Sequence, residues 1–399
     1  MEPAHLDEWD DELAGLTTRI APLFYRQESK RHAEQYLRGL LSPLARKNGW
    51  TIAEYVGESE PKALQRFLNL SPWDAAELMV VNRMYAMENL ADRGGILVAD
   101  PTGFAKKGTK SVGVQRQYSG TLGRVDRCQI ATFLCYVTTQ RDRVLIDCRL
   151  YIPEKSWMDD PERCAEAGVP PEITFKTRPQ QVREMIEAAR TAEVPFAWFT
   201  ADEEFGQNPG LCDFLEAERL PYLMGIPKNT TFRDAKGASH EIEKYVRQLS
   251  LNTWQRRACG IGAKGYRVYD WALVTSTETD RQYLIRRSID DGELAYYRCY
   301  NPNHAGFVEL VQVAGARWPI EECFGAAKNE TGLDNYQIRT WPAWNRHMAF
   351  AMLAHTFLAV TAQRARKSGH HTASSVSTGR TPPPQCRTDP SPTDSTDPR

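Results

Sequence analysis

The spacing of apolar residues in this 399-residue chain changes near residue 96, and that change limits the folds open to it. Over residues 36–44 apolar side chains recur at intervals of three and four, which is typical of amphipathic helices. From residue 96 onward, short apolar runs such as 96–99 and 196–201 indicate buried strands, and residues 178–192 between them predict a helix. This order predicts an α/β fold with a mixed sheet behind a helical N-terminal region.

Composition and spacing divide the chain into five predicted segments. Residues 1–92 are predicted to be helical, and residues 93–228 to form the first part of an α/β core. Residues 229–315 contain several strand-like runs and no strong helix after 241–249, so they are predicted to be a β-rich insertion before the next helix, near Trp318. Residues 316–367 are predicted to be the helices that complete the core. Residues 368–399 hold six Ser, six Thr and six Pro, and such a segment is predicted to be a disordered tail because it buries too little apolar surface.

Charge and cysteine content narrow the class of protein. Fifty Lys and Arg against 51 Asp and Glu give a net charge of -1, so a polyanion would have to bind at local basic patches. Nine cysteines without a CxxC pair favour reduced thiols over a disulfide frame or a zinc site. The acidic N-terminus has no signal-peptide pattern, and the longest apolar stretch, 348–360, is too short to span a membrane. We therefore expect a cytoplasmic protein that does not bind membranes.

Three acidic residues could form a catalytic site. Asp100 and Asp202 follow predicted strands, where open α/β sheets place ligands, although an aspartate there is more often a turn former or a helix cap. Glu321 and Lys328 are seven residues apart and would share one helix face, with Arg317 one turn before Glu321; an exposed charged helix has the same pattern. Taken together, the three carboxylates could bind a pair of Mg²⁺ or Mn²⁺ ions for phosphoryl transfer. Lys328 and Arg317 would then contact the phosphate.

The segment from Gly103 to Arg127 supports a nucleic acid substrate. It is rich in glycine and contains only one acidic residue, Asp126. It directly follows Asp100, so bound phosphate would lie beside the proposed metal ions. DNA contact is favoured over a plain solvated hairpin, and the candidate DNA-binding residues are Lys106, Lys107, Lys110, Arg116, Tyr118 and Arg124. The basic stretch from Lys30 to Lys47 in the helical region is more often a solvated helix face.

Several blocks of the sequence resemble one known family. They are YLRGLL with RKNGW near the start, D-x-TGF-x-KKG followed by RQYSG, TADEEFGQNPGL, LPYLMGIPK, and RWPIEECF with KNETGLDNYQIR. In these blocks the chain resembles bacterial DDE transposases of the insertion sequence 701 family, over about residues 10–365. Two positions depart from the family pattern: Ala314 stands where the wider group has Tyr, and Pro101 where an acidic residue is commoner.

The resemblance implies a fold, a site and a reaction. The fold would be an RNase H-like catalytic domain with a β-rich insertion, and residues 1–92 would bind DNA. The catalytic, metal-binding triad would be Asp100, Asp202 and Glu321; Glu321 is chosen over Glu322 because only Glu321 has an Arg four residues before it and a Lys seven after it. The cofactor would be Mg²⁺, with Mn²⁺ possible, at two ions per active site.

Three functions remain open at this point. The first is a transposase, working as a homodimer on double-stranded DNA, that cleaves at the terminal inverted repeats of its element and joins the 3′ ends to target DNA. The second is a domesticated transposase that binds DNA with weak or no cleavage. The third is an RNase H-like nuclease without transposition, which would cleave DNA and give no strand-transfer product.

Overall fold

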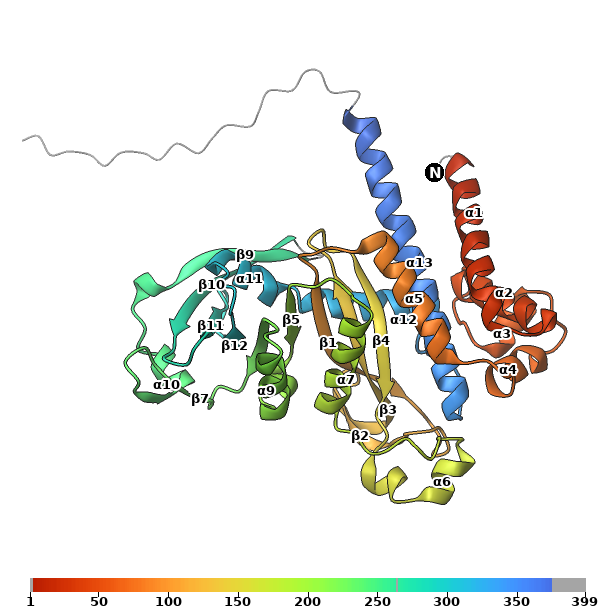
Figure 1. The fold of residues 1–399 in the computed structure, drawn as a ribbon, viewed down its shortest axis with the longest axis horizontal. Helices are drawn as coiled ribbons and strands as arrows, with labels where there is room; N and C mark the ends of the chain where they lie inside the picture. Colours follow the sequence, from red (N-terminus) through yellow and green to blue (C-terminus); the bar gives the residue numbers. More distant parts are fainter. Residues whose placement is uncertain (1–2, 263–264, 375–399) are drawn as a thin grey trace, which may run out of the picture. The chain divides into compact units, whose positions relative to one another are not determined.

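A ten-stranded mixed sheet organises the protein, whose computed structural model describes residues 3–262 and 265–374 (Figure 1). The neighbouring strands β1, β5 and β6 are parallel, and the other pairs are antiparallel. Across the sheet the order is β2 (Gln115–Ser119), β3 (Arg124–Val137), β1 (Ile96–Ala105), β5 (Trp198–Ala201), β6 (Tyr222–Ile226), β12 (Leu294–Tyr300), β11 (Arg281–Arg287), β10 (Gly265–Thr275) and β9 (Gln255–Gly262), and β4 (Arg143–Leu150) pairs with β3. The mixed α/β class is thus as predicted.

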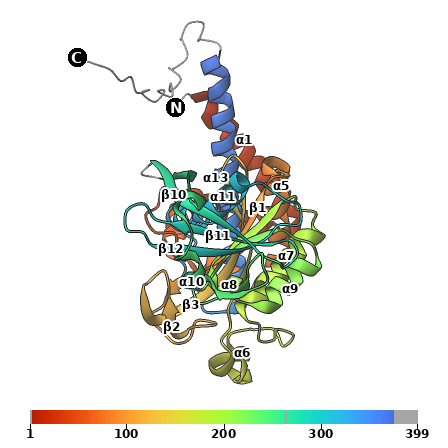
Figure 2. The same cartoon turned by 90° about the vertical axis from the view of Figure 1, so that its left-hand side faces the viewer.

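Helices cover both faces of the sheet. On β3 the Thr132 hydroxyl donates to Gln181 of α7 (Arg178–Thr191) at 3.0 Å, while the ring of the next residue, Phe133, lies 5.4 Å from that of Phe324 on α12 (Trp318–Thr331). Successive side chains of a strand point to opposite faces, so α7 and α12 lie on opposite sides of the sheet. Helix α9 (Pro209–Ala217) lies beside α7 on the same side (Figure 2).

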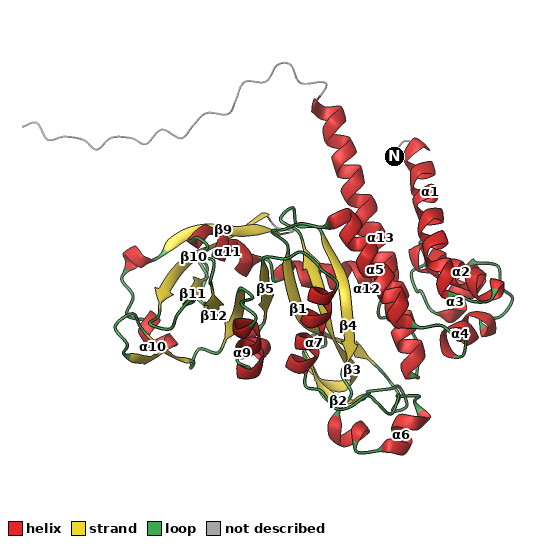
Figure 3. Cartoon of the chain, viewed as in Figure 1, coloured by secondary structure: helices red, strands yellow, loops and turns green. Residues whose placement is uncertain are grey.

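Helices expected before residue 93 pack against the buried first part of α13 (Trp341–Ser374). Tyr36 Oη and His347 Nδ1 are 2.7 Å apart, and Thr356 Oγ1 donates to Asn82 at 2.7 Å. The helices are α1 (Pro3–Ile20), α2 (Gln27–Leu41), α3 (Gly49–Tyr55), α4 (Lys62–Asn69) and α5 (Ala75–Leu90) (Figure 3). Across the described ranges, no helix is both long and apolar enough to cross a membrane.

The end of α13 differs from the prediction. Residues 368–374, expected to begin a disordered tail, are helical, because α13 continues to Ser374. The rest of the predicted tail, residues 375–399, lies outside the described residues. Among the described residues, 362–374 belong to a unit separate from the residues up to 361.

The β-rich segment is present but is not a sheet of its own. Strand β12 pairs with β6 of the core, so β9–β12 extend the core sheet. The segment also contains a helix that was not predicted, α11 (Phe307–Gly315), and the shorter elements β7 (Thr231–Arg233), β8 (Ser239–Glu241) and α10 (Ile242–Val246). The next helix was expected only near Trp318, so the purely β-rich prediction was wrong for residues 307–315.

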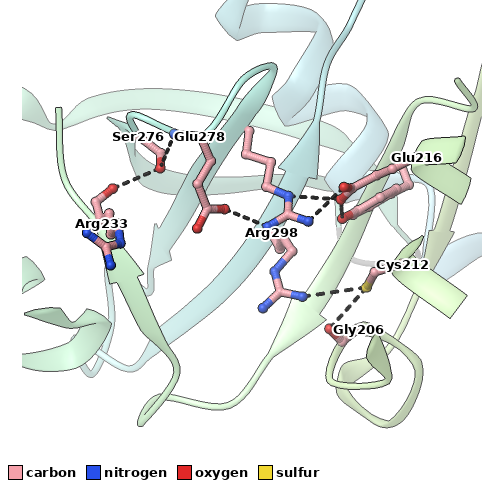
Figure 4. Close-up of polar contacts among 9 residues, drawn as sticks. Gly206, Cys212, Glu216, Arg233, Ser276, Glu278 and Arg298 are labelled. Carbon is pink, nitrogen blue, oxygen red and sulfur yellow. Dashed lines mark hydrogen bonds and ion pairs between the residues drawn. The ribbon is translucent and has the colours of Figure 1, made fainter. Parts of the chain in front are cut away.

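Polar side chains fasten these strands to the core helices. The Arg281 guanidinium of β11 donates two hydrogen bonds to Glu216 of α9, at 2.9 and 2.7 Å. Arg298 of β12 contacts the Cys212 sulfur at 3.5 Å, and that thiol donates to the Gly206 carbonyl (Figure 4). The extended part of the sheet is therefore held both by strand pairing and by contacts to the helices beside Asp202.

Candidate active site

Asp100 and Asp202 lie at the same level of two neighbouring strands. Asp100 was expected to follow the end of its strand, but this was wrong, because β1 continues through Asp100 to Ala105 by pairing with β3. In the parallel pair β1–β5, Ala99 lies opposite Ala201, and each is followed by one of the two aspartates. Strand β5 ends there, and Asp202 caps the short helix α8 (Glu203–Gly206) by accepting a hydrogen bond from the Glu204 N–H at 3.0 Å. The two aspartates therefore share one edge of the parallel part of the sheet.

A glycine on the third parallel strand sets the position of Asp202. A Cβ on Gly225 would lie 2.9 Å from the Glu203 nitrogen and 3.2 Å from the Asp202 carbonyl carbon. The first distance is shorter than real Cβ contacts and the second is tight, so Gly225 lets the backbone of α8 pack directly on β6. Gly206 makes the reciprocal close approach, since its Cβ would lie 1.9 Å from the Gly225 oxygen.

Helix α12 supplies the third acid and a lysine. Its buried stripe includes Ile320, Cys323, Phe324 and Ala327, which leaves Glu321 and Lys328 free to face a cleft. Glu321 is 56% exposed and its carboxylate lies 3.4 Å from Arg317 Nη1.

We call the space between these residues the acid cleft; its volume is about 780 Å³. Lys328 Nζ donates to Thr102 Oγ1 of β1 at 2.8 Å, and burial lowers the pKa of this lysine. The cleft is lined by Asp100, Pro101, Thr102, Gly103, Gln115, Gln117, Tyr118, Ser119, Gly120, Thr121, Ile130, Tyr151, Arg178, Asp202, Glu204, Glu321, Phe324, Gly325 and Lys328.

The acid cleft concentrates negative charge in a poorly solvated place. Burial, together with the charges of Asp202 and Glu321, raises the pKa of Asp100 to about 7 against the opposing effect of Arg317. Burial also raises the pKa of Asp202, although backbone hydrogen bonds from Glu204 oppose that shift. Carboxylates that repel one another in this way are well suited to a bound cation.

Two charged residues of the acid cleft were not predicted as site residues. Arg178, at the start of α7, forms an ion pair with Glu204 at 2.7 Å. Burial raises the pKa of the Glu204 carboxyl, and Arg178 opposes this shift. The sequence could have indicated Glu204 as a site residue, because it follows Asp202 by two residues. Nothing in the sequence distinguishes Arg178 from any other arginine at the start of a helix.

The structure places the predicted DNA-binding residues in different settings. Tyr118, which is 64% exposed, joins Lys328 in lining the acid cleft. Lys107 and Arg116 are exposed outside it. Arg317 lies next to Asp202 in an adjoining groove. These residues extend positive charge around the acids.

Lys110 and Arg124 are also exposed, but each has an acidic partner. Lys110 pairs with Glu166 at 3.2 Å and Arg124 with Asp126 at 2.8 Å. Exposed pairs of this kind are weak and can open to admit a phosphate.

Lys106 differs from the other basic residues of its segment. Its ammonium lies 3.4 Å from the centroid of the Tyr336 ring and 3.3 Å from the Tyr336 carbonyl oxygen, which it bonds. Burial lowers the pKa of Lys106 to about 7. Its half-buried side chain is thus packed against Tyr336, in contrast to the exposed position that DNA contact requires.

The donor set of the acid cleft fits a hard divalent cation. Asp100, Asp202 and Glu321 offer only oxygen ligands, which suit Mg²⁺ and Mn²⁺. Throughout residues 3–262 and 265–374, no three His, Cys, Asp or Glu side chains already stand close enough to enclose an ion. The exposed Glu321, paired with Arg317, is the acid with most freedom to turn inward.

Comparison with known proteins identifies the family. Residues 19–248, more than half of the chain, match the family described as DDE superfamily endonuclease. The chain belongs to this family. Residues 177–357 also match the family described as transposase DDE domain. The two matched ranges together contain Asp100, Asp202 and Glu321.

A curated relative of this DDE endonuclease confirms the predicted resemblance. The probable transposase for insertion sequence element IS701 of Microchaete diplosiphon is 29% identical over 328 residues, which cover 78% of this chain and 77% of the relative. Among solved structures, that of the piggyBac transposase synaptic complex with hairpin DNA is similar at 10% identity and a TM-score of 0.49, over 86% of this chain and 68% of that one.

Proposed function

We propose that this DDE endonuclease is a transposase that binds the terminal inverted repeats of its element, cleaves there and joins the 3′ ends to target DNA. The observation that carries the proposal is the presence of Asp100, Asp202 and Glu321 in one cleft with Lys328. The name of the curated relative supports the same reaction class.

Asp100, Asp202 and Glu321 would hold the divalent cations. The raised pKa of Asp100, about 7, supports this role, because a cation would relieve the repulsion among the carboxylates. When bound, two Mg²⁺ ions, or Mn²⁺ in their place, would supply activation of the attacking oxygen and stabilisation of the leaving 3′ oxygen.

The remaining cleft residues would hold the DNA. Lys328, oriented by Thr102, would contact the phosphate as a point charge. The planar guanidinium of Arg317 would contact it with two parallel N–H groups. The exposed ring of Tyr118 offers a stacking face for a base next to the cut. Lys107, Arg116, Lys110 and Arg124 would bind the backbone further out.

The assembly would be a homodimer on DNA, because two element ends require two acid clefts. The N-terminal helices would recognise the repeats, and the exposed Arg46 and Arg31, the latter 3.8 Å from Glu58, would contact the DNA backbone. The proposed location is the bacterial cytoplasm, in association with DNA.

A cleavage and joining assay tests the proposal. The DNA flanking the gene would supply the inverted repeats, which are then placed on a supercoiled plasmid with Mg²⁺ and a second plasmid as target. Cleavage at the repeats with joined products is expected. Tight binding without cleavage would instead support the alternative of a domesticated DNA-binding protein. Pro101, which lines the cleft, is the residue that favours this alternative. Cleavage without joined products would favour the nuclease.

A further inference from the structure

The turn between β2 and β3 has a defined structure at the edge of the acid cleft. The Leu122 N–H donates to the Ser119 carbonyl at 3.1 Å. A second hydrogen bond joins the Gly123 N–H to the Gly120 carbonyl at 3.2 Å. Gly123 has a φ of +64°, a left-handed conformation that glycine adopts without strain. The side chains of this turn therefore have fixed positions.

A glycine of β1 lets the turn lie directly against that strand. A Cβ on Gly103 would lie 2.1 Å from Ser119 Oγ, so a side chain there would displace Ser119. The Gly103 N–H also donates to Thr121 Oγ1 at 3.2 Å. The turn is thus fastened to β1 close to Asp100.

Hydroxyl groups connect the turn to Lys328. The Lys328 ammonium donates to Thr102 Oγ1 at 2.8 Å, so the hydrogen of that hydroxyl is left for Thr121 Oγ1, 3.2 Å away. Thr121 Oγ1 then accepts from both Thr102 and the Gly103 N–H. A hydroxyl has two acceptor sites and one donor hydrogen. The hydrogen of the exposed Thr121, which lines the acid cleft, therefore remains for a ligand.

Ser119 supplies a second hydroxyl at the same place. It lines the acid cleft and is 2% exposed, and its Oγ has no hydrogen-bond partner among the described residues. Buried polar side chains are nearly always paired, and an unpaired one often marks a place where a further polar group binds. Two hydroxyl donors beside the Lys328 ammonium match the acceptor oxygens of a phosphate.

We propose that Thr121 and Ser119, with Lys328, form a phosphate subsite of the acid cleft. The proposal rests on the proposed function, because the phosphate would belong to the DNA strand that is cut. Thr102 follows Asp100 by two residues on β1 and both line the cleft, so their side chains share one face about 7 Å apart. The subsite therefore holds the phosphate next to the one that is cut.

The hydroxyl groups act by direction and add no charge. The salt dependence of DNA binding reports the number of phosphates that cationic side chains neutralise. Removing the two hydroxyls should consequently weaken binding at every salt concentration alike and leave the salt slope unchanged. This behaviour separates the subsite from the exposed lysines and arginines around the cleft.

The test compares Thr121→Val/Ser119→Ala with the wild-type chain, the single variants Thr121→Val and Thr121→Ser, and Thr191→Val. Thr191 is exposed at the last residue of α7, and its hydroxyl bonds a carbonyl of its own helix, so its substitution removes a hydroxyl elsewhere. The probes are duplexes that carry the terminal repeat and the cleavage position. In each duplex one phosphate near the cut is replaced by an uncharged methylphosphonate. Binding is measured with EDTA, so that no strand is cut.

We expect the double variant to bind the unmodified duplex about tenfold more weakly than the wild type. A methylphosphonate next to the cut should weaken binding by the wild type and change binding by the double variant little, because both changes remove the same contact. At other linkages the two effects should add. Thr121→Ser and Thr191→Val should bind as the wild type does.

Other outcomes separate the subsite from the proposed function. Additive effects at every linkage would overturn the subsite, and so would coupling at the cut linkage itself, because the hydroxyls would then contact the reacting phosphate. Equal losses in Thr121→Ser and Thr121→Val would also overturn it, since the shape of the side chain and not its hydroxyl would matter. Coupling at the expected linkage, without cleavage by the wild-type chain in Mg²⁺, would instead count against the proposed function.

Discussion

Glu321 and Glu322 are adjacent on α12 but contact different surfaces. Glu321 lines the acid cleft beside Arg317, whereas Glu322 pairs with Arg143 and Arg267 outside it. Adjacent helical residues are about 100° apart around the axis, so one turn of helix serves both surfaces. Of the two glutamates, Glu321 is therefore the one that shares a cleft with Asp100 and Asp202.

We predict that Asp100→Asn, Asp202→Asn and Glu321→Gln each abolish plasmid cleavage while DNA binding stays near normal. An amide keeps the shape of the side chain but lacks the charge that holds a cation beside a phosphate. The effects should not add in double variants, because each one disables the same site.

Glu322→Gln provides the matched comparison on the same helix. It should keep cleavage at saturating DNA, because its carboxylate lies outside the acid cleft. Cleavage that survives Glu321→Gln and disappears with Glu322→Gln would show that the wrong glutamate was chosen.

The exposed and buried lysines of the basic segment should behave differently. Lys107→Ala with Arg116→Ala should weaken DNA binding regardless of sequence and lower the salt slope by about 0.9 for each phosphate left without a cationic partner. Lys106→Ala should mainly lower the melting temperature, because it removes packing against Tyr336. Filter binding at several salt concentrations and thermal melts separate the two effects. An unchanged salt slope in the double variant would make this segment a solvated hairpin.

Gly225→Ala should impair cleavage more than folding. The added methyl group would press on the Glu203 nitrogen, so the backbone that carries Asp202 would have to move. Overpacking of this kind costs about 1–3 kcal/mol, which a domain of this size can survive. Cleavage should fall by at least about 100-fold, since a shift of about 1 Å can misplace a catalytic group. Wild-type cleavage by a folded Gly225→Ala variant would show that Asp202 tolerates the displacement.

The buried His347 should make the protein sensitive to acid. Burial lowers the pKa of His347 to about 4 from an ordinary 6.5, so between these values the unfolded chain binds more protons than the folded one. Stability from this group is complete above pH 6.5 and is lost as the pH falls to 4, by about 3 kcal/mol.

Denaturant unfolding at about pH 7 and about pH 4.5, on either side of the ordinary histidine pKa, checks this effect. The free energy of unfolding of His347→Gln should change less between these pH values than that of the wild type. His304→Gln, at an exposed histidine, should retain the wild-type change. Equal changes in all three proteins would contradict the assignment.

The sequence was most informative where a structure depends on local pattern. The run 96–99 and the strand before Asp202 each consist mostly of apolar residues followed by an acid, and the structure pairs them in register. The spacing of Glu321 and Lys328 likewise depends only on helix geometry. These features could be predicted because each is encoded in a short stretch of neighbouring residues.

Features that depend on distant partners could not be predicted in the same way. Strand β9 has little apolar alternation and is a strand because β10 pairs with it. Helix α11 is short and rich in valine, so its sequence is equally compatible with a strand. The packed position of Lys106 depends on Tyr336, which lies 230 residues further along the chain.

The pairing of β6 with β12 has a consequence for shortened forms of the protein. If residues 229–315 were deleted, β6 would lose β12, one of its two neighbours, and the backbone N–H and C=O groups on that side would lie open at the margin of the sheet. Such an unprotected strand recruits other chains, so the truncated protein should form aggregates and not a smaller nuclease. A shortened form would therefore need another strand, a helix or a loop to cover the edge of β6.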